Sequence, residues 1–228
     1  MVEILQRDKL ARGGFEGVRE YRLVVDDRVA NGRKRDESWQ GLGNFVYLAD
    51  ARFLPQGETG LHSHRGIDVI SVMLDGRLTH EGSMQQGQSL AAYDVQVQRA
   101  GGEGFSHNEV NPDDSENRMI QLWVLPERNE GAAGYQCFQL TRGGVTRVYG
   151  GLREQDTVFP AGTCIDIARL NGGQSLDVDK AAMIYICTGR GFADEGSAGE
   201  GDLLRVDQLT FDATEDTCLI IIHQLDRP

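Results

Sequence analysis

The sequence predicts an all-β protein, and three observations lead to this prediction. Short runs rich in β-branched and other apolar residues recur along the chain, with turn signals between them. Glycine is abundant at 29 residues and proline is rare at 5, a balance that suits many tight turns between strands. Long amphipathic patterns with the helical period are hard to find. Together these features are typical of β-sandwiches and β-barrels.

The first half contains three clear candidate strands. Residues 44–53 (NFVYLADARF) form one, and residues 68–76 (DVISVMLDG) form another that ends in an Asp-Gly turn signal. The third candidate, residues 118–125 (RMIQLWVL), alternates strictly between two faces. One of these faces carries Met119, Gln121 and Trp123.

The second half repeats this pattern. Its clearest candidate strands are 163–170, 182–191 and 217–225. Both halves contain β runs that close on a glycine turn, which suggests a duplicated barrel. A polar, glycine-rich stretch without periodicity separates the halves. We therefore expect an N-terminal barrel over residues 1–127, a connector over 128–135 and a C-terminal barrel over 136–228.

Charge and cysteine usage narrow the classes of partner and compartment. The net charge of −12 argues against direct binding to nucleic acid or to anionic membranes, both of which attract lysine and arginine. The chain has no apolar run long enough for a membrane span, and its start does not read as a signal peptide. The four cysteines lie far apart, as expected for reduced thiols. The sequence thus predicts a cytoplasmic protein.

Three of the five histidines fall in two short motifs. His62 and His64 stand one residue apart, and His107 and Glu109 repeat this spacing further along the chain. Residues i and i+2 of a β-strand point to the same face, so each pair can offer two donor atoms to one metal ion. A lone His-x-His is more often a surface or hydrogen-bonded pair. The second pair favours a metal site, because two pairs on neighbouring strands can converge.

Three imidazoles and one carboxylate form a mixed nitrogen and oxygen donor set. Such a set suits Fe(II), Mn(II), Ni(II) or Zn(II) better than calcium or magnesium, and it leaves room on the metal for substrate or O₂. The sequence leaves two readings open for His80: a donor or substrate contact beside the site, or an ordinary strand histidine. His223 lies in an apolar run without an evident partner, and we expect a structural role for it.

Two segments of the first half resemble the metal-site segments of the pirin family. The first is residues 60–84 (GLHSHRGIDVISVMLDGRLTHEGSM) and the second is residues 99–109 (RAGGEGFSHNE), followed by IQLWVLPE at 120–127. The resemblance is specific from about residue 60 to residue 127 and only topological beyond it. The departures, among them Ser63 and Asn108, avoid the ligand positions. Asp68 stands where the family often has glutamate, and we expect it to contact ligands or to be structural.

The resemblance implies a bicupin, in which two jelly-roll β-barrels pack together and the first barrel holds one metal. By the same resemblance the metal ligands are His62, His64, His107 and Glu109, and the favoured metal is Fe(II), with Ni, Mn, Zn or Cu as alternatives. The second half has no His-x-His motif, so we expect no metal there. We expect a monomer, because a bicupin already supplies two barrels.

Two functions remain open from the sequence. The first, which the resemblance implies, is a dioxygenase that cleaves quercetin or a related flavonol with O₂, with Glu109 as general base. Met73 and Trp123 are candidate walls of the aromatic pocket, although core packing is the favoured reading for both. The alternative function is a non-enzymatic, iron-containing regulator that binds a protein partner and responds to redox state. A purely structural metal ranks last.

Overall fold

The computed structural model describes residues 2–30, 37–84, 88–152, 158–194 and 196–225. These residues form β-strands and one short 3-10 helix, η1 (Arg7–Lys9), so the all-β prediction is confirmed. The strands predicted from the sequence are present, except that the predicted strand 182–191 is divided at Gly189 into two strands. In the described part of the chain, no helix has the length and apolar character needed to cross a membrane.

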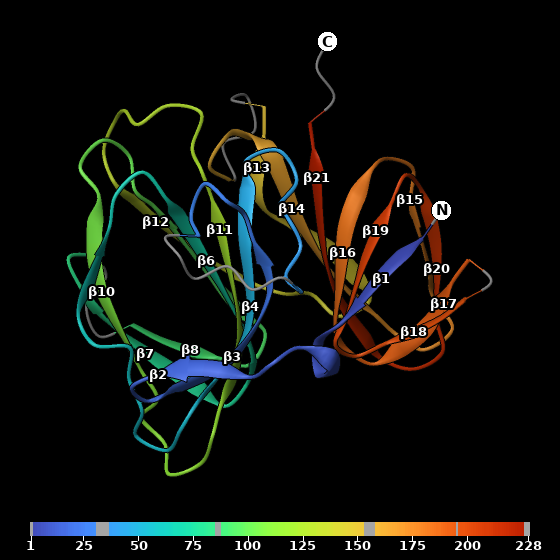
Figure 1. Cartoon of the computed structure of the whole chain (residues 1–228), viewed down its shortest axis with the longest axis horizontal. Helices are drawn as coiled ribbons and strands as arrows, with labels where there is room; N and C mark the ends of the chain where they lie inside the picture. Colours follow the sequence, from blue (N-terminus) through green and yellow to red (C-terminus); the bar gives the residue numbers. More distant parts are fainter. Residues whose placement is uncertain (1, 31–36, 85–87, 153–157, 195, 226–228) are drawn as a thin grey trace. The chain divides into compact units, whose positions relative to one another are not determined.

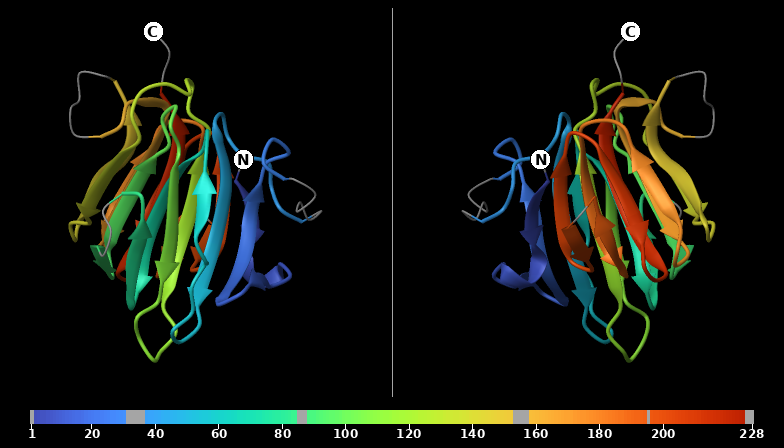
Figure 2. Two further views of the ribbon diagram at one scale, coloured as in Figure 1. Left: turned by 90° about the vertical axis from the view of Figure 1, so that its left-hand side faces the viewer. Right: turned by 90° about the vertical axis from the view of Figure 1, so that its right-hand side faces the viewer.

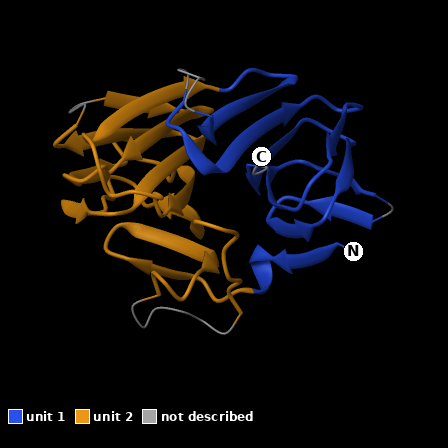
Figure 3. Ribbon diagram, turned by 90° about the horizontal axis from the view of Figure 1, so that it is seen from above, with its two compact units in different colours: residues 1–9, 140–228 blue, residues 10–139 orange. Residues whose placement is uncertain are grey.

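The chain divides into two compact units, shown in different colours in Figure 3. One unit consists of residues 10–139, and we call it the first barrel. The other consists of residues 1–9 and 140–228, and we call it the second barrel. Each barrel is built from one large and one small antiparallel sheet (Figure 1).

The first barrel contains a seven-stranded sheet and a four-stranded sheet. The left view of Figure 2 shows several strands of the larger sheet lying side by side. In spatial order, the larger sheet consists of β12 (Gly134–Gln139), β9 (Asp94–Arg99), β6 (Asp68–Asp75), β11 (Arg118–Val124), β4 (Phe45–Phe53), β3 (Val18–Val25) and β2 (Gly13–Phe15). The smaller sheet consists of β5 (His62–His64), β10 (Phe105–Val110), β7 (Arg77–Gly82) and β8 (Gln88–Ala91).

The second barrel contains a six-stranded sheet and a four-stranded sheet. The larger sheet consists of β1 (Glu3–Gln6), β19 (Asp202–Val206), β16 (Ala182–Thr188), β21 (Thr217–Gln224), β14 (Ala161–Leu170) and β13 (Gly144–Gly151). The smaller sheet consists of β15 (Ser175–Val178), β20 (Leu209–Ala213), β17 (Arg190–Ala193) and β18 (Gly196–Gly199).

The strand orders of the two barrels correspond. The order β12-β9-β6-β11-β4-β3 in the first barrel matches β1-β19-β16-β21-β14-β13 in the second. The order β5-β10-β7-β8 matches β15-β20-β17-β18 in the same way. The weak internal similarity in the sequence thus corresponds to a repeated strand order. Every strand of the second barrel has a counterpart at the same place in the first.

The compact units differ from the predicted division at both ends of the first barrel. Strand β12 begins inside the predicted connector and pairs with β9, so the first barrel extends to residue 139. Strand β1 pairs with β19, with Glu3 opposite Arg205, so residues 1–9 belong to the second barrel. The physical reason is the same in both cases, since each edge strand supplies backbone partners that its sheet would otherwise leave unpaired.

An ion pair between Asp50 and Arg118 lies buried on neighbouring strands of the first barrel. Arg118 Nε donates to Asp50 Oδ1 at 3.0 Å and Nη2 donates to Oδ2 at 2.6 Å, with side-chain exposures of only 6% and 2%. Removing one partner of such a pair leaves a buried charge without its counter-ion.

We therefore expect Asp50→Asn to lower the free energy of unfolding by about 3–5 kcal/mol. Chemical denaturation with a linear extrapolation measures this change. Asp216→Asn is the matched control, since the Arg142–Asp216 pair is about 60% exposed on both sides and its loss should cost less than about 1 kcal/mol. Equal losses from the two variants would contradict the assignment.

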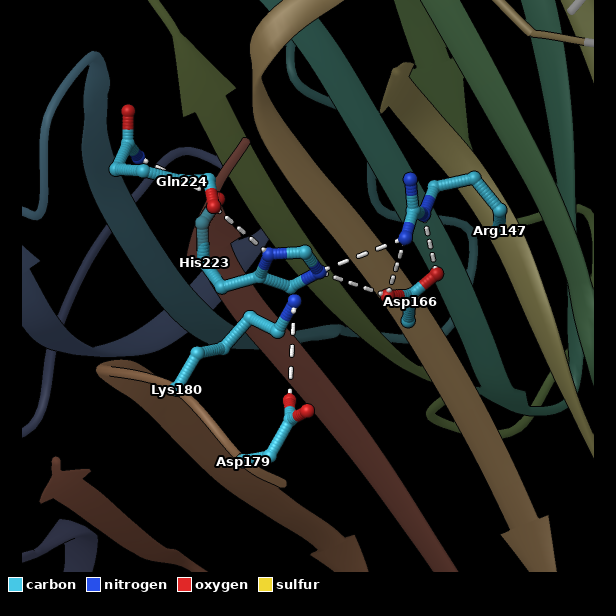
Figure 4. Close-up of polar contacts among 6 residues, drawn as sticks. All are labelled: Arg147, Asp166, Asp179, Lys180, His223 and Gln224. Carbon is cyan, nitrogen blue, oxygen red and sulfur yellow. Dashed lines mark hydrogen bonds and ion pairs between the residues drawn. The ribbon is translucent and has the colours of Figure 1, made fainter. Parts of the chain in front are cut away.

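His223 has partners that the sequence did not reveal. Its Nε2 lies 3.0 Å from Asp166 Oδ2, and Asp166 also accepts two hydrogen bonds from Arg147 (Figure 4). The register places Asp166 opposite the core residue Ile221, so this cluster lies on the inner face of the six-stranded sheet. The expectation that His223 stands without a partner was wrong, because both partners come from strands distant in sequence.

The pKa of Asp166 leads to a prediction about acid stability. Burial alone would raise this pKa, but the hydrogen bonds from His223 and Arg147 outweigh burial and hold it below the ordinary value of 3.8. The stabilisation is therefore fully present above about pH 4 and is lost as the pH falls through the lowered pKa. We expect Asp166→Asn to flatten the acid limb of melting temperature against pH. The exposed Asp207→Asn should leave that limb unchanged, and a steep limb in both variants would refute the prediction.

Candidate metal centre

The two histidine motifs lie on adjacent strands of the small sheet in the first barrel. His62 and His64 are the ends of β5, and His107 on β10 pairs directly with His62. Two-residue spacing puts His62 and His64 on one face, and the pairing puts His107 on the same face. His107 Nε2 lies 3.0 Å from His62 Nε2 and 3.1 Å from His64 Nε2. The three rings thus converge through the same ring nitrogen.

A glycine allows the close approach of these two strands. Gly104 immediately precedes β10 and has a φ of +76°, a conformation that favours glycine. A Cβ atom added there would lie 2.6 Å from the carbonyl oxygen of His64, closer than any real contact. The β10 strand can therefore start beside His64 only because residue 104 lacks a side chain.

The protonation state of the histidine rings suits metal binding. Burial and the neighbouring His62 lower the pKa of His64 to about 4. Burial and the surrounding histidines lower the pKa of His107 to about 2. Both rings are therefore neutral at pH 7 and carry a free lone pair. His62 Nδ1 lies 2.9 Å from the carbonyl oxygen of Gly60, to which it donates, and this leaves the lone pair on Nε2.

This donor set fits a transition metal. The ligand atoms of the three histidines lie within 4.8 Å of one another, and neutral imidazole is the commonest protein ligand for such ions. His107 Nδ1 is buried and makes no hydrogen bond to any described residue. The other ring nitrogen, Nε2, is the one that lies beside His62 and His64. The three imidazoles could therefore hold a metal ion.

Glu109 lies two residues after His107 on β10 but stands outside the gathered ligand atoms. Its fully buried carboxylate accepts hydrogen bonds from Ser71 Oγ at 2.9 Å, from Gln96 Nε2 at 3.1 Å and from Gln121 Nε2 at 3.1 Å. Burial raises the pKa of Glu109 to about 7, and the three hydrogen bonds limit the rise. Glu109 as a fourth ligand stays a prediction.

The three donors to Glu109 were not foreseen from the sequence. Ser71, Gln96 and Gln121 are neighbours in register on β6, β9 and β11, which places them in one row across the large sheet. A signal was present in the run DVQVQR (94–99), where glutamines recur at alternate positions of a predicted strand face. Polar residues that recur on one face of a barrel strand indicate a polar interior.

The remaining predicted site residues lie at varied distances from the histidines. His80 is fully buried, accepts a hydrogen bond from Gln98 at 2.9 Å and has its ring 5.5 Å from that of His107. Trp123 stacks on Tyr47 at 4.2 Å, with its ring edge-on to His64 at 5.7 Å.

Two other candidates serve the packing of the first barrel. Met73 is fully buried in a hydrophobic cluster with Phe53, Leu78 and Met119, which agrees with the core-packing reading. The carboxylate of Asp68 accepts a hydrogen bond from the backbone of Ala100 at 2.8 Å. That contact ties β6 to the residue directly after β9 and corresponds to the structural alternative for Asp68.

In the second barrel, the corresponding positions carry hydrocarbon side chains. Matching strand order and register places Leu176 and Val178 where β5 has its histidines, and Phe211 and Ala213 where β10 has His107 and Glu109. Phe211, Val178 and Ala213 belong to the core cluster, and Leu176 packs against it. These positions offer no donor atoms to a metal ion.

Comparisons with known proteins point to one family. The family model described as Pirin matches residues 28–124. A pirin-like protein of Caulobacter vibrioides is 30% identical over 178 residues, which cover 65% of this chain and 64% of that protein. A Zymomonas mobilis protein provisionally named quercetin 2,3-dioxygenase is 25% identical over 186 residues, with coverage of 76% and 79%. With several other relatives, the alignment spans less than two thirds of the relative's own length.

Solved structures agree on the fold. The bacterial pirin YhhW from Escherichia coli, crystallised with nickel(II), superposes with a TM-score of 0.83 at 15% identity, covering 97% of this chain and 98% of that one. Quercetin 2,3-dioxygenase from Acinetobacter baumannii superposes with a TM-score of 0.72 at 20% identity, covering 97% and 85%. At these identities the likeness shows the fold alone.

Proposed function

We propose that this chain is a metal-dependent dioxygenase of the pirin family, which cleaves quercetin or a related flavonol with O₂. The single observation that carries the proposal is the convergence of three imidazole nitrogens, two of them on neutral rings, on the same barrel face as a buried carboxylate. Relatives named as quercetin 2,3-dioxygenases support the substrate class.

His62, His64 and His107 would hold the metal, and Glu109 would be the fourth ligand. Fe(II) is the proposed ion, and Ni, Mn, Zn and Cu compete for the same nitrogen donors. The structural neighbour crystallised with nickel(II) supports a divalent transition metal. When bound, the ion would supply Lewis acidity that lowers the pKa of an enolic hydroxyl on the substrate.

Glu109 would take the proton of the flavonol hydroxyl as general base. It lies on the same face of β10 as His107, so its carboxylate faces the same interior as the imidazoles that would hold the metal. Trp123, edge-on to His64, would contact a flat aromatic ring. Deprotonation makes the ring electron-rich, and reaction with O₂ then opens it and releases carbon monoxide.

The test uses protein purified without chelator. Elemental analysis gives the bound metal, and absorbance under air gives quercetin loss from the same preparation. Near-stoichiometric transition metal together with metal-dependent turnover is the expected result. Metal without turnover would refute the quercetin substrate and favour the redox-sensitive regulator that binds a protein partner. A protein that takes up no metal after reconstitution would refute the metal site itself.

A further inference from the structure

Glu109 stands where two hydrogen-bonded arms of similar construction meet. In one arm Trp123 Nε1 donates to Gln121 Oε1 at 3.2 Å, and Gln121 Nε2 donates to Glu109 Oε2 at 3.1 Å. In the other arm Tyr135 Oη donates to Gln96 Oε1 at 3.2 Å, and Gln96 Nε2 donates to Glu109 Oε1 at 3.1 Å. Each arm thus consists of an aromatic donor, a glutamine and one oxygen of the carboxylate.

The aromatic donor of the first arm decides the orientation of its glutamine. A side-chain amide can turn over by exchanging its oxygen and its NH₂ group, and both orientations fill the same space. The indole N–H of Trp123 can only donate, so it requires the amide oxygen of Gln121 on its side. The NH₂ group of Gln121 must then face Glu109.

The second arm uses a hydroxyl, which could donate or accept. Cys137 Sγ donates to Tyr135 Oη at 3.1 Å, so the hydroxyl already accepts one hydrogen bond and its own hydrogen is available for Gln96 Oε1. Tyr135 lies on β12, the edge strand at one side of the large sheet, whereas Trp123 lies on β11. The two arms therefore reach Glu109 from separate strands.

We infer that Trp123 and Tyr135 are positioning residues of the metal site, which fix the amides of Gln121 and Gln96 so that N–H donors face both oxygens of Glu109. The inference rests on the proposed function, because it takes Glu109 as a working group of that site. With both amides fixed, the carboxylate is held in one orientation. Without an anchor, its glutamine can turn its oxygen toward Glu109 and repel it.

The experiment measures metal affinity by competition with a chelator, using Co(II) as the probe. The variants are Trp123→Phe and Tyr135→Phe, each of which keeps an aromatic ring and removes the donor. Trp123→Phe also removes part of the indole ring system, and its control therefore carries the same substitution. The matched controls are Trp39→Phe, at the chain's other tryptophan, and Tyr93→Phe, in the turn before β9. Each variant is made both in the native chain and in a chain carrying Glu109→Ala.

In the native chain, we expect each anchor variant to weaken Co(II) binding by about tenfold and each control to change it less than twofold. In the Glu109→Ala chain, the same anchor variants should have no further effect, because the group they position is gone. Melting temperatures should stay close to the native value. An equal effect in both chains would overturn the inference and assign the anchors to general stability, and so would no effect in the native chain.

This readout is separate from turnover. A protein that binds Co(II) with the predicted dependence on the anchors but does not consume quercetin would refute the proposed substrate and keep the inference. If turnover is present, Tyr135→Phe should lower kcat and leave KM nearly unchanged, because Tyr135 acts on Glu109 through Gln96 and has no proposed contact with the substrate. A rise in KM alone in Tyr135→Phe would place Tyr135 against the substrate and overturn its positioning role.

Discussion

His107→Ala and His62→Ala are each expected to abolish stoichiometric metal binding. Each substitution removes one of the three nitrogens that lie within 4.8 Å of one another, and two imidazoles alone hold a divalent ion far more weakly. Elemental analysis after reconstitution and desalting should find less than about a tenth of the native metal content. Loss of the metal should remove all metal-dependent turnover at the same time.

His223→Ala is the matched control for these variants. It also removes a hydrogen-bonded histidine from a barrel strand. That strand belongs to the second barrel, where the described residues form no histidine cluster. Its metal content should match that of the native protein. Full metal retention in both His62→Ala and His107→Ala would show that the ion, if any, binds elsewhere.

Glu109→Gln is expected to keep the protein folded and metal-loaded but to lower turnover by at least about a hundredfold. The amide fills the same space as the carboxylate, yet it cannot accept a proton at neutral pH. Steady-state quercetin consumption at matched metal content measures the loss. Glu81→Gln on the neighbouring strand β7 is the control, since its exposed carboxylate makes no part of the site.

Two outcomes would count against this role. Full turnover in Glu109→Gln would show that another group accepts the proton. Loss of metal together with turnover would make Glu109 essential for binding and leave its role as base without support. Metal content must therefore be determined on the same samples as the rate.

The sequence was sufficient to predict that His62, His64 and His107 converge, because the information needed is largely local. His62 and His64 share one three-residue strand, and a two-residue spacing specifies their common face without knowledge of any other element. The prediction for His107 required one more assumption, that its strand pairs with the strand of His62 and His64. Gly104 makes this pairing possible, because it lets the backbone of β10 approach His64 closely.

The carboxylate's surroundings could not be predicted in the same way. Ser71, Gln96 and Gln121 come from three strands, and only the register of the large sheet brings them into one row. A shift of one residue in any strand would turn its side chain to the opposite face. Single-strand patterns carry no information about register between strands, so the row was visible only in the structure.

The sheets to which the edge strands β1 and β12 belong could not be predicted, for a different reason. Strand β1 has only four residues and β12 has only six, so neither carries a long periodic signal. Both were assigned to the nearest half of the chain because sequential elements usually pair. The short strand β1 instead joins the barrel formed by the other end of the chain.

The pairing of β1 with β19 also constrains how the chain can fold during synthesis. Glu3 and Arg205 interact across 202 positions of sequence, with the whole first barrel between them. On the ribosome the first barrel can close as soon as residue 139 emerges, whereas the initial strand must wait for the last part of the chain. Until then the β19 edge has no partner, and a sheet edge of this kind is a site where other chains can add a strand. The topology therefore sets the order of folding: residues 10–139 can fold first, and residues 1–9 and 140–228 complete the second barrel afterwards.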